Sequence, residues 1–188
     1  SVLVTGPLAR QSLVARGADP GKVRVFANTV DPERFAAAAD VAVVVVGLNQ
    51  DTESEGEDRA DIDLPGEQAD LVRAVVEANP RTAVVLIAGS PVDMTSWLAK
   101  TPAVLQAWYG GSEAGHALAS VVFGDVSPSG KLPCTFPKSL ADSPAHAAGL
   151  ARQFPGEGGK VWYDEGLLVG YRWNDAKAIE PLFPFGHG

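Results

Sequence analysis

The chain has 188 residues, which is enough for one well-buried domain. Hydrophobic residues make up 46% of it and charged residues 20%, a composition that is typical of folded proteins and too apolar for a disordered one. The formal net charge is −8, and the Lys and Arg residues are scattered singly, so neither a nucleic acid nor an anionic membrane is expected as a partner.

Short apolar runs alternate with helical patterns along the chain. The runs are rich in β-branched residues and continuously apolar, which is typical of strands covered on both faces. We expect strands at 2–6, 23–27, 41–47, 83–89 and 103–111. Helices are expected at 65–80, ended by Pro80, and at 112–125, with Gly124 as the C-terminal cap. This alternation predicts an α/β fold, a three-layer α/β/α sandwich with a mostly parallel sheet.

The last third of the chain has a different character. Residues 125–159 are dense in Pro, Gly and Ser and show little periodicity, so we expect them to wrap a surface or to form part of an interface. The tail at 161–188 is rich in aromatic residues. Such residues suit packing in a core or between domains, and they could also form a platform for a sugar.

Several common signatures are missing from the sequence. There is no P-loop and no dinucleotide-binding glycine motif, "PGEGGK" at 155–160 reads as a plain turn, and "AGSPV" at 88–92 does not complete a nucleophile elbow. The three His residues are far apart and lack metal-ligand spacing, and Cys134, the only cysteine, is expected to be a small core residue. We therefore predict neither a cofactor nor a metal.

Membrane and targeting signals are missing as well. No apolar run reaches the ~20 residues that a membrane helix needs, and the N-terminus lacks the pattern of a signal peptide. A soluble chain is expected, either cytoplasmic or secreted.

One acidic loop stands out. In "LNQDTESEGEDR", residues 48–59, five carboxylates are crowded together: Asp51, Glu53, Glu55, Glu57 and Asp58. The loop follows the carboxyl end of the strand expected at 41–47, and functional groups gather at such ends in parallel sheets. The residues alone allow two interpretations, a solvated connection or a loop that holds one carboxyl group with a raised pKa for proton transfer.

Five ordered segments carry a resemblance to a known family. They are "DVAVVVVGLNQDTESEGEDRADIDLPGEQADLV", "VVLIAGSPVDM", "PAVLQAWYGGSEAGHALASVVFGDVSPSGKLPCTFP", "FPGEGGKVWYDEGLLVGYRW" and "PLFPFGHG". Residues 40–188 thereby resemble the C-terminal α/β-sandwich domain of glycoside hydrolase family 3, the family of β-glucosidases and β-xylosidases.

The resemblance implies roles for individual residues of the acidic loop. The general acid/base of the family falls on Glu55, in "SEG", with Glu53 as the runner-up. Asp58 and Arg59 match a D-R pair that shapes the loop, with Arg59 as an ion-pair partner of Asp58 or Asp63. Where the family has an aromatic residue this chain has Glu57, which departs from the usual packing of the loop.

The resemblance also implies the reaction and a partner. Retaining glycosidases use two carboxyl groups ~5–5.5 Å apart, one as the nucleophile and one as the acid/base. The family nucleophile lies on a preceding (β/α)8 barrel domain, and the chain has no counterpart of it. We therefore expect a domain that lends its acid/base to the hydrolysis of β-glucosides or related β-glycosides, with the barrel domain as partner and little activity when isolated.

The first part of the chain fits the family less well. Residues 1–39 are expected to form a strand-helix-strand segment packed on the same sheet, with 40–188 as the family 3 domain. Within that segment, residues 8–35 weakly resemble the linker of a GT-B glycosyltransferase. Two alternatives to a hydrolase domain therefore stay open, a non-catalytic module that binds a carbohydrate or a partner, and a glycosyltransferase fragment.

Overall fold

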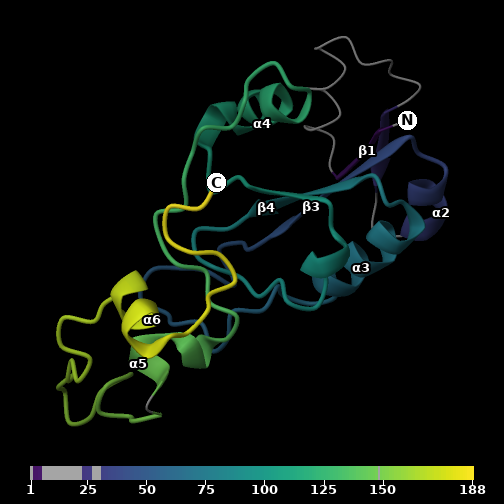
Figure 1. Cartoon of the computed structure of the whole chain (residues 1–188). Coiled ribbons are helices and arrows are strands. Elements are labelled where there is room, and N and C mark those ends of the chain that lie inside the picture. The colour runs from purple at the N-terminus through teal and green to yellow at the C-terminus, as the bar shows by residue number, and fades with distance from the viewer. Residues whose placement is uncertain (1, 6–22, 27–30, 148) are drawn as a thin grey trace. The chain divides into compact units, whose positions relative to one another are not determined.

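The computed structural model describes residues 2–5, 23–26, 31–147 and 149–188 (Figure 1). Two compact units make up the chain. Unit 1 consists of Ser1–Arg59, Leu64–Ser90 and Ser96–Pro128, and unit 2 consists of Ala60–Asp63, Pro91–Thr95 and Ser129–Gly188. Much of the segment predicted at 1–39, including 6–22 and 27–30, lies outside the described residues, and so do the central residues of the glycosyltransferase-like pattern.

Unit 1 is built on a sheet of five parallel strands in the order β2-β1-β3-β4-β5. The strands are β1 (Val2–Thr5), β2 (Val23–Phe26), β3 (Val41–Gly47), β4 (Thr82–Ile87) and β5 (Ala103–Gln106). This order belongs to the doubly wound sheets, in which ligands bind beyond the carboxyl ends of the strands. The predicted parallel sheet is confirmed.

Helices lie on both sides of this sheet. Figure 1 shows α2 (Pro32–Ala37) and α3 (Gln68–Ala78) on one side and α4 (Ala114–Val122) on the other. Two short 3₁₀ helices, η1 (Leu98–Lys100) and η2 (Gly111–Glu113), lie in the connections. The three-layer α/β/α fold predicted from the sequence is therefore the fold of this unit.

The core of unit 1 explains why the strands are apolar without alternation. In β4, the side chains of Val84, Val85 and Leu86 are all fully buried, so both faces of the strand are covered. The helix α3 buries Val72, Val75 and Val76. Burial of each such side chain stabilises the fold by about 1.5–3 kcal/mol.

Several elements have other bounds than the sequence prediction, most of all β5 and α3. β5 stops at Gln106 rather than at 111, because Trp108 has a φ of +54°, which no strand residue adopts. α3 is shorter than the predicted 65–80, and its C-cap is Asn79. Gly124 follows the last residues of α4 with a φ of +80°, as expected for a C-terminal glycine.

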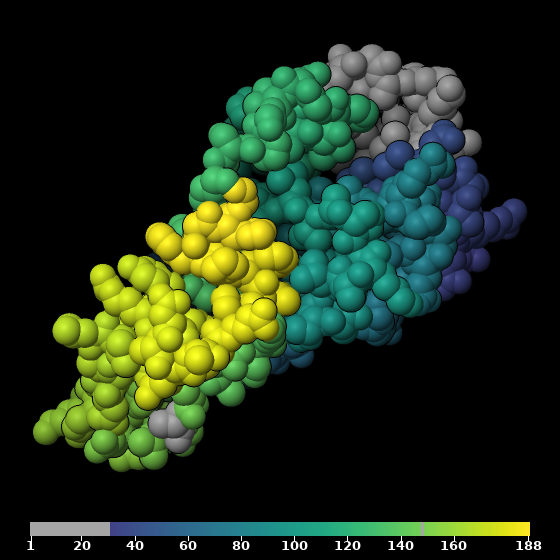
Figure 2. Space-filling view, in the orientation of Figure 1, coloured from purple at the N-terminus to yellow at the C-terminus, as the bar shows by residue number. Residues whose placement is uncertain are grey.

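Unit 2 holds little regular structure: η3 (Leu140–Asp142), α5 (Pro144–Ala147) and α6 (Tyr171–Lys177). An antiparallel bridge joins Phe136 to Phe183, and the Phe136 side chain is only 1% exposed. The segment "PGEGGK" contains a tight turn, in which Glu157 and Lys160 exchange two backbone hydrogen bonds of 2.9 and 3.0 Å. Figure 2 shows the surface of the C-terminal residues 149–188 in yellow-green to yellow.

Candidate active site

The acidic loop leaves the carboxyl end of β3 and folds into a tight turn. Ser54 and Glu57 form an isolated antiparallel bridge, which places Glu55 and Gly56 at the two central positions. Gly56 has a φ of +87°, as the third residue of a type II turn requires. Glu55 therefore lies at the exposed tip of the turn, and within the described chain no hydrogen bond or ion pair of its side chain is found.

Glu53, two residues earlier, is bound tightly. One carboxylate oxygen accepts from the backbone N–H of Gly89 at 2.8 Å and from the hydroxyl of Tyr109, and the other oxygen accepts from the hydroxyl of Ser90. Gly89 and Ser90 follow β4, and Tyr109 follows β5. The Glu53 side chain therefore fastens the loop after β3 to the ends of the next two strands.

These contacts set the charge of Glu53. Partial burial raises its pKa, but the hydrogen bonds from Ser90, Tyr109 and Gly89, together with the positive charge of Arg59, outweigh burial and lower the pKa below its usual value of 4.5. Burial and the bond to Glu53 raise the pKa of the Tyr109 phenol. Near neutral pH, the pair is thus a carboxylate and a protonated phenol.

The strand ends are shaped for this contact. A Cβ atom at Gly89 would lie 2.9 Å from the Tyr109 ring and 3.1 Å from a Glu53 carboxylate oxygen, so the glycine leaves room for both side chains. Next to Tyr109, Trp108 has the left-handed φ of +54°, a conformation rarely found for a bulky residue and common at functional sites. We infer that this backbone turn directs the phenol toward Glu53.

The start of the loop is held by the side chain of Gln68. The side-chain amide of Gln68 accepts a hydrogen bond from the Gly47 N–H at 2.7 Å and donates one to the Gly47 carbonyl at 3.0 Å. The same amide nitrogen donates to the Pro65 carbonyl at 3.2 Å. Gln68, from the "LPGEQ" segment, thereby satisfies both backbone groups of the last residue of β3.

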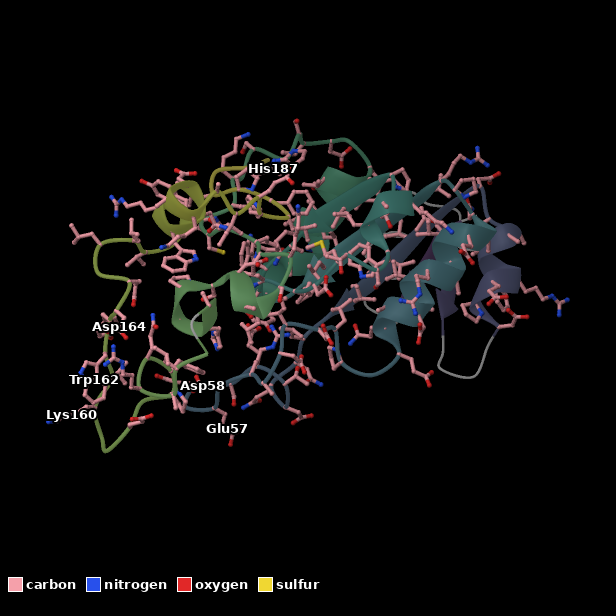
Figure 3. All side chains as sticks on the ribbon, turned by 60° about the horizontal axis from the view of Figure 1, so that its bottom comes forward. Glu57, Asp58, Lys160, Trp162, Asp164 and His187 are labelled. Carbon is pink, nitrogen blue, oxygen red and sulfur yellow. The ribbon has the colours of Figure 1, made fainter. Side chains whose placement is uncertain are left out.

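The end of the loop is held by Arg59. Its Nη1 donates to the Ser90 hydroxyl oxygen at 3.1 Å. The sequence predicted Arg59 as a loop-shaping residue with an acidic partner, and Ser90 was not among the expected contacts. Asp58 and Glu57 are exposed, and Figure 3 shows Glu57 pointing away from the sheet.

Sequence reasoning brought only the acidic loop to attention and missed Ser90, Tyr109 and Gln68. Their signal was positional, since Ser90 directly follows the strand expected at 83–89 and Tyr109 lies near the end of the strand expected at 103–111. Among the described residues no cluster of three potential metal ligands occurs. Likewise, no helix in the described ranges is long and apolar enough to cross a membrane.

Unit 2 carries many exposed apolar side chains close together in the sequence. Tyr163 is 76% exposed and Leu167 is 89% exposed. Others in the same stretch are Val161, Trp162, Val169 and Tyr171. Figure 3 labels Trp162 on this segment, beside Asp164, which forms an ion pair of 2.7 Å with Arg152.

Comparison with known proteins identifies the family. Residues 11–171 match the family model described as the glycosyl hydrolase family 3 C-terminal domain. The chain is 50% identical over 162 residues to a beta-glucosidase of Rhizobium radiobacter, an alignment that covers 86% of this chain and 20% of that protein.

Solved structures agree with this match. The structure of a family 3 beta-glucosidase from Bifidobacterium adolescentis superposes with a TM-score of 0.85 at 35% identity, covering 100% of this chain and 31% of that one. A beta-glucosidase from Kluyveromyces marxianus in complex with glucose gives a TM-score of 0.77 at 44% identity, covering 84% of this chain and 18% of that one. The chain thus spans about a fifth to a third of such relatives, and it belongs to glycosyl hydrolase family 3 as a C-terminal domain.

Proposed function

We propose that this chain supplies the general acid/base of a β-glucosidase active site, with Glu55 as the acid/base and the nucleophile on a barrel domain outside this chain. The observation that carries the proposal is the contrast between two carboxyl groups of one loop. Glu55 lies exposed at the tip of a tight turn, whereas Glu53 is held by three hydrogen bonds.

The same contrast argues against Glu53 as the acid. A general acid must carry a proton near neutral pH, and the three donors around Glu53 stabilise its ionised form instead. All of the carboxylate contacts of Glu53 are directed to its own domain. Glu55 is free to reach a glycosidic oxygen bound on a neighbouring domain.

The chemistry follows from a carboxyl group at that position. In the first step, protonated Glu55 gives its proton to the glycosidic oxygen as the nucleophile attacks the anomeric carbon. In the second step, the Glu55 carboxylate removes a proton from the water that hydrolyses the glycosyl-enzyme. Relatives named beta-glucosidases make a β-glucoside the substrate class to test first.

The exposed apolar side chains of unit 2 support a second part of the proposal, a contact with the barrel domain. Large exposed apolar residues, such as Tyr163 and Leu167, usually mark interaction sites in soluble proteins. We infer that the 161–171 segment contacts the barrel domain. A non-catalytic sugar-binding module would also use such residues, and it predicts sugar binding by this chain alone that is unchanged in Glu55→Gln.

The test combines this chain with a separately produced barrel domain of a family 3 β-glucosidase and follows the hydrolysis of aryl β-glucosides. We expect activity only in the mixture and a loss of about 10²–10⁴-fold in kcat/KM for poor leaving groups in Glu55→Gln. Added azide should restore turnover of activated substrates in that variant, because azide needs no general base. Glu57→Gln, on the same turn, is the control and should keep its activity. Activity that is unchanged in Glu55→Gln would refute the role of Glu55.

A further inference from the structure

We propose that Glu53 and Ser90 are positioning residues that fasten the base of the acid/base turn to the ends of β4 and β5. The proposal rests on the proposed function of Glu55 and extends it to residues that touch no substrate.

The geometry that carries it is a shared contact on the two sides of the turn. Glu53 precedes the Ser54–Glu57 turn and Arg59 follows it, and both side chains bind the hydroxyl of Ser90. The hydroxyl donates to Glu53 and accepts from Arg59, which uses its donor and one lone pair at once. A single serine therefore closes the loop at its base.

The remaining partners of Glu53 connect this closure to the sheet. The Gly89 N–H and the Tyr109 hydroxyl both donate to the Glu53 oxygen that does not contact Ser90. They follow β4 and β5, two neighbouring hydrogen-bonded strands of the sheet. Because every partner of the carboxylate is a donor, the loop is held by charge-assisted hydrogen bonds, which are stronger than neutral ones.

A fixed base matters because the tip is exposed and otherwise unsupported. Gly56 has open space around its Cα, with no atom within 4 Å of an added Cβ. Among the described residues, the space beside Gly56 is therefore open, and the hydrogen bonds at the base of the turn are the contacts that fix its position. A displacement of about 1 Å of a catalytic group can cost 10²-fold in rate.

The experiment compares Ser90→Ala and Ser90→Thr, with Ser96→Ala as the matched control. Ser96 is another serine of unit 1, whose hydroxyl accepts a hydrogen bond from the exposed Arg73. Two readouts are taken: backbone amide hydrogen exchange of residues 48–59 in this chain, and kcat/KM of the chain combined with the barrel domain for β-glucosides of good and poor leaving groups.

Ser90→Ala is expected to speed exchange across residues 54–59 without changing exchange in β3. It should also lower kcat/KM by about 10–100-fold for poor leaving groups and by less than about threefold for good ones, because only the former depend on a placed acid. Ser90→Thr keeps a hydroxyl and should restore both properties. A general loss of folding would instead lower the rates for all substrates together.

Two outcomes would overturn the proposal. Unchanged exchange at 54–59 in Ser90→Ala would show that the serine does not fasten the loop. Faster exchange with an equal loss for all leaving groups would show that the fastening does not position the acid. If Glu55→Gln itself shows no dependence on the leaving group, the proposed function fails, and the exchange data still decide whether Ser90 holds the loop.

Discussion

Replacing Gly47 with alanine tests whether the strand end before the acidic loop tolerates any side chain. A Cβ atom there would lie 1.8 Å from the carbonyl oxygen of Ile87, a backbone atom of β4, whereas ordinary contacts begin near 3.4 Å. The strands would have to move apart by about 1.6 Å, the difference between 1.8 and 3.4 Å. That carbonyl also accepts the Leu48 N–H at 2.8 Å, so this hydrogen bond is lost as well.

The expected cost combines two effects. Overpacking against an element that cannot yield costs about 1–3 kcal/mol. A buried backbone group left without its partner costs a further ~1–3 kcal/mol. We therefore expect Gly47→Ala to lower the free energy of unfolding by about 3 kcal/mol, a large part of the 5–15 kcal/mol typical of a domain.

Urea unfolding of the chain measures this change as a lower midpoint. Gly56→Ala is the matched control, because Gly56 also lies in this region but has open space around it. Its φ of +87° alone should cost about 1–2 kcal/mol. If Gly47→Ala destabilises the chain no more than Gly56→Ala does, the close approach of the two strands is not what requires the glycine.

Two further predictions concern the attachment of the loop. Gln68→Leu removes the amide that satisfies both backbone groups of Gly47, and it should lower the free energy of unfolding by at least about 2 kcal/mol, measured in urea. The exposed neighbour Glu67 is its control, and an equal effect of Glu67→Ala would contradict the reasoning. The second prediction concerns pH: since the folded pKa of Glu53 lies below 4.5, its stabilising contribution is present above pH 4.5 and is lost as the pH falls through the folded pKa. The difference in unfolding free energy between the wild type and Glu53→Gln should therefore shrink in acid, and a difference that grows there would refute the assignment.

The fold could be predicted because its signals are local. Strands covered on both faces, such as β3 and β4, are continuously apolar, and the intervening helix α3 shows its buried valines at helical spacing. The helix α6 was not predicted, because it lacks such a local signal. It buries only Asn174, so no apolar period marks it in the sequence.

The candidate site could be predicted only in part. The acidic loop was visible because its charges follow a buried strand, and the choice of Glu55 came from family resemblance. The contacts of Glu53 were not visible, because Ser90 and Tyr109 lie 37 and 56 residues further along the chain. Which loops meet depends on the strand order. The left-handed backbone of Trp108, next to Tyr109, has no signature in the sequence, because tryptophan rarely adopts this conformation.

The division of the chain into two units has a consequence for anyone who wishes to transplant or shorten this domain. Unit 2 is not a contiguous stretch, because Ala60–Asp63 and Pro91–Thr95 leave the sheet unit to join it and the chain then returns. The second of these excursions contributes Val92 and Met94, which are 0% and 2% exposed. A cut after Pro128 would separate these two buried side chains from Ser129–Gly188, the largest part of their unit. The acid loop and the C-terminal third are therefore to be moved as one piece.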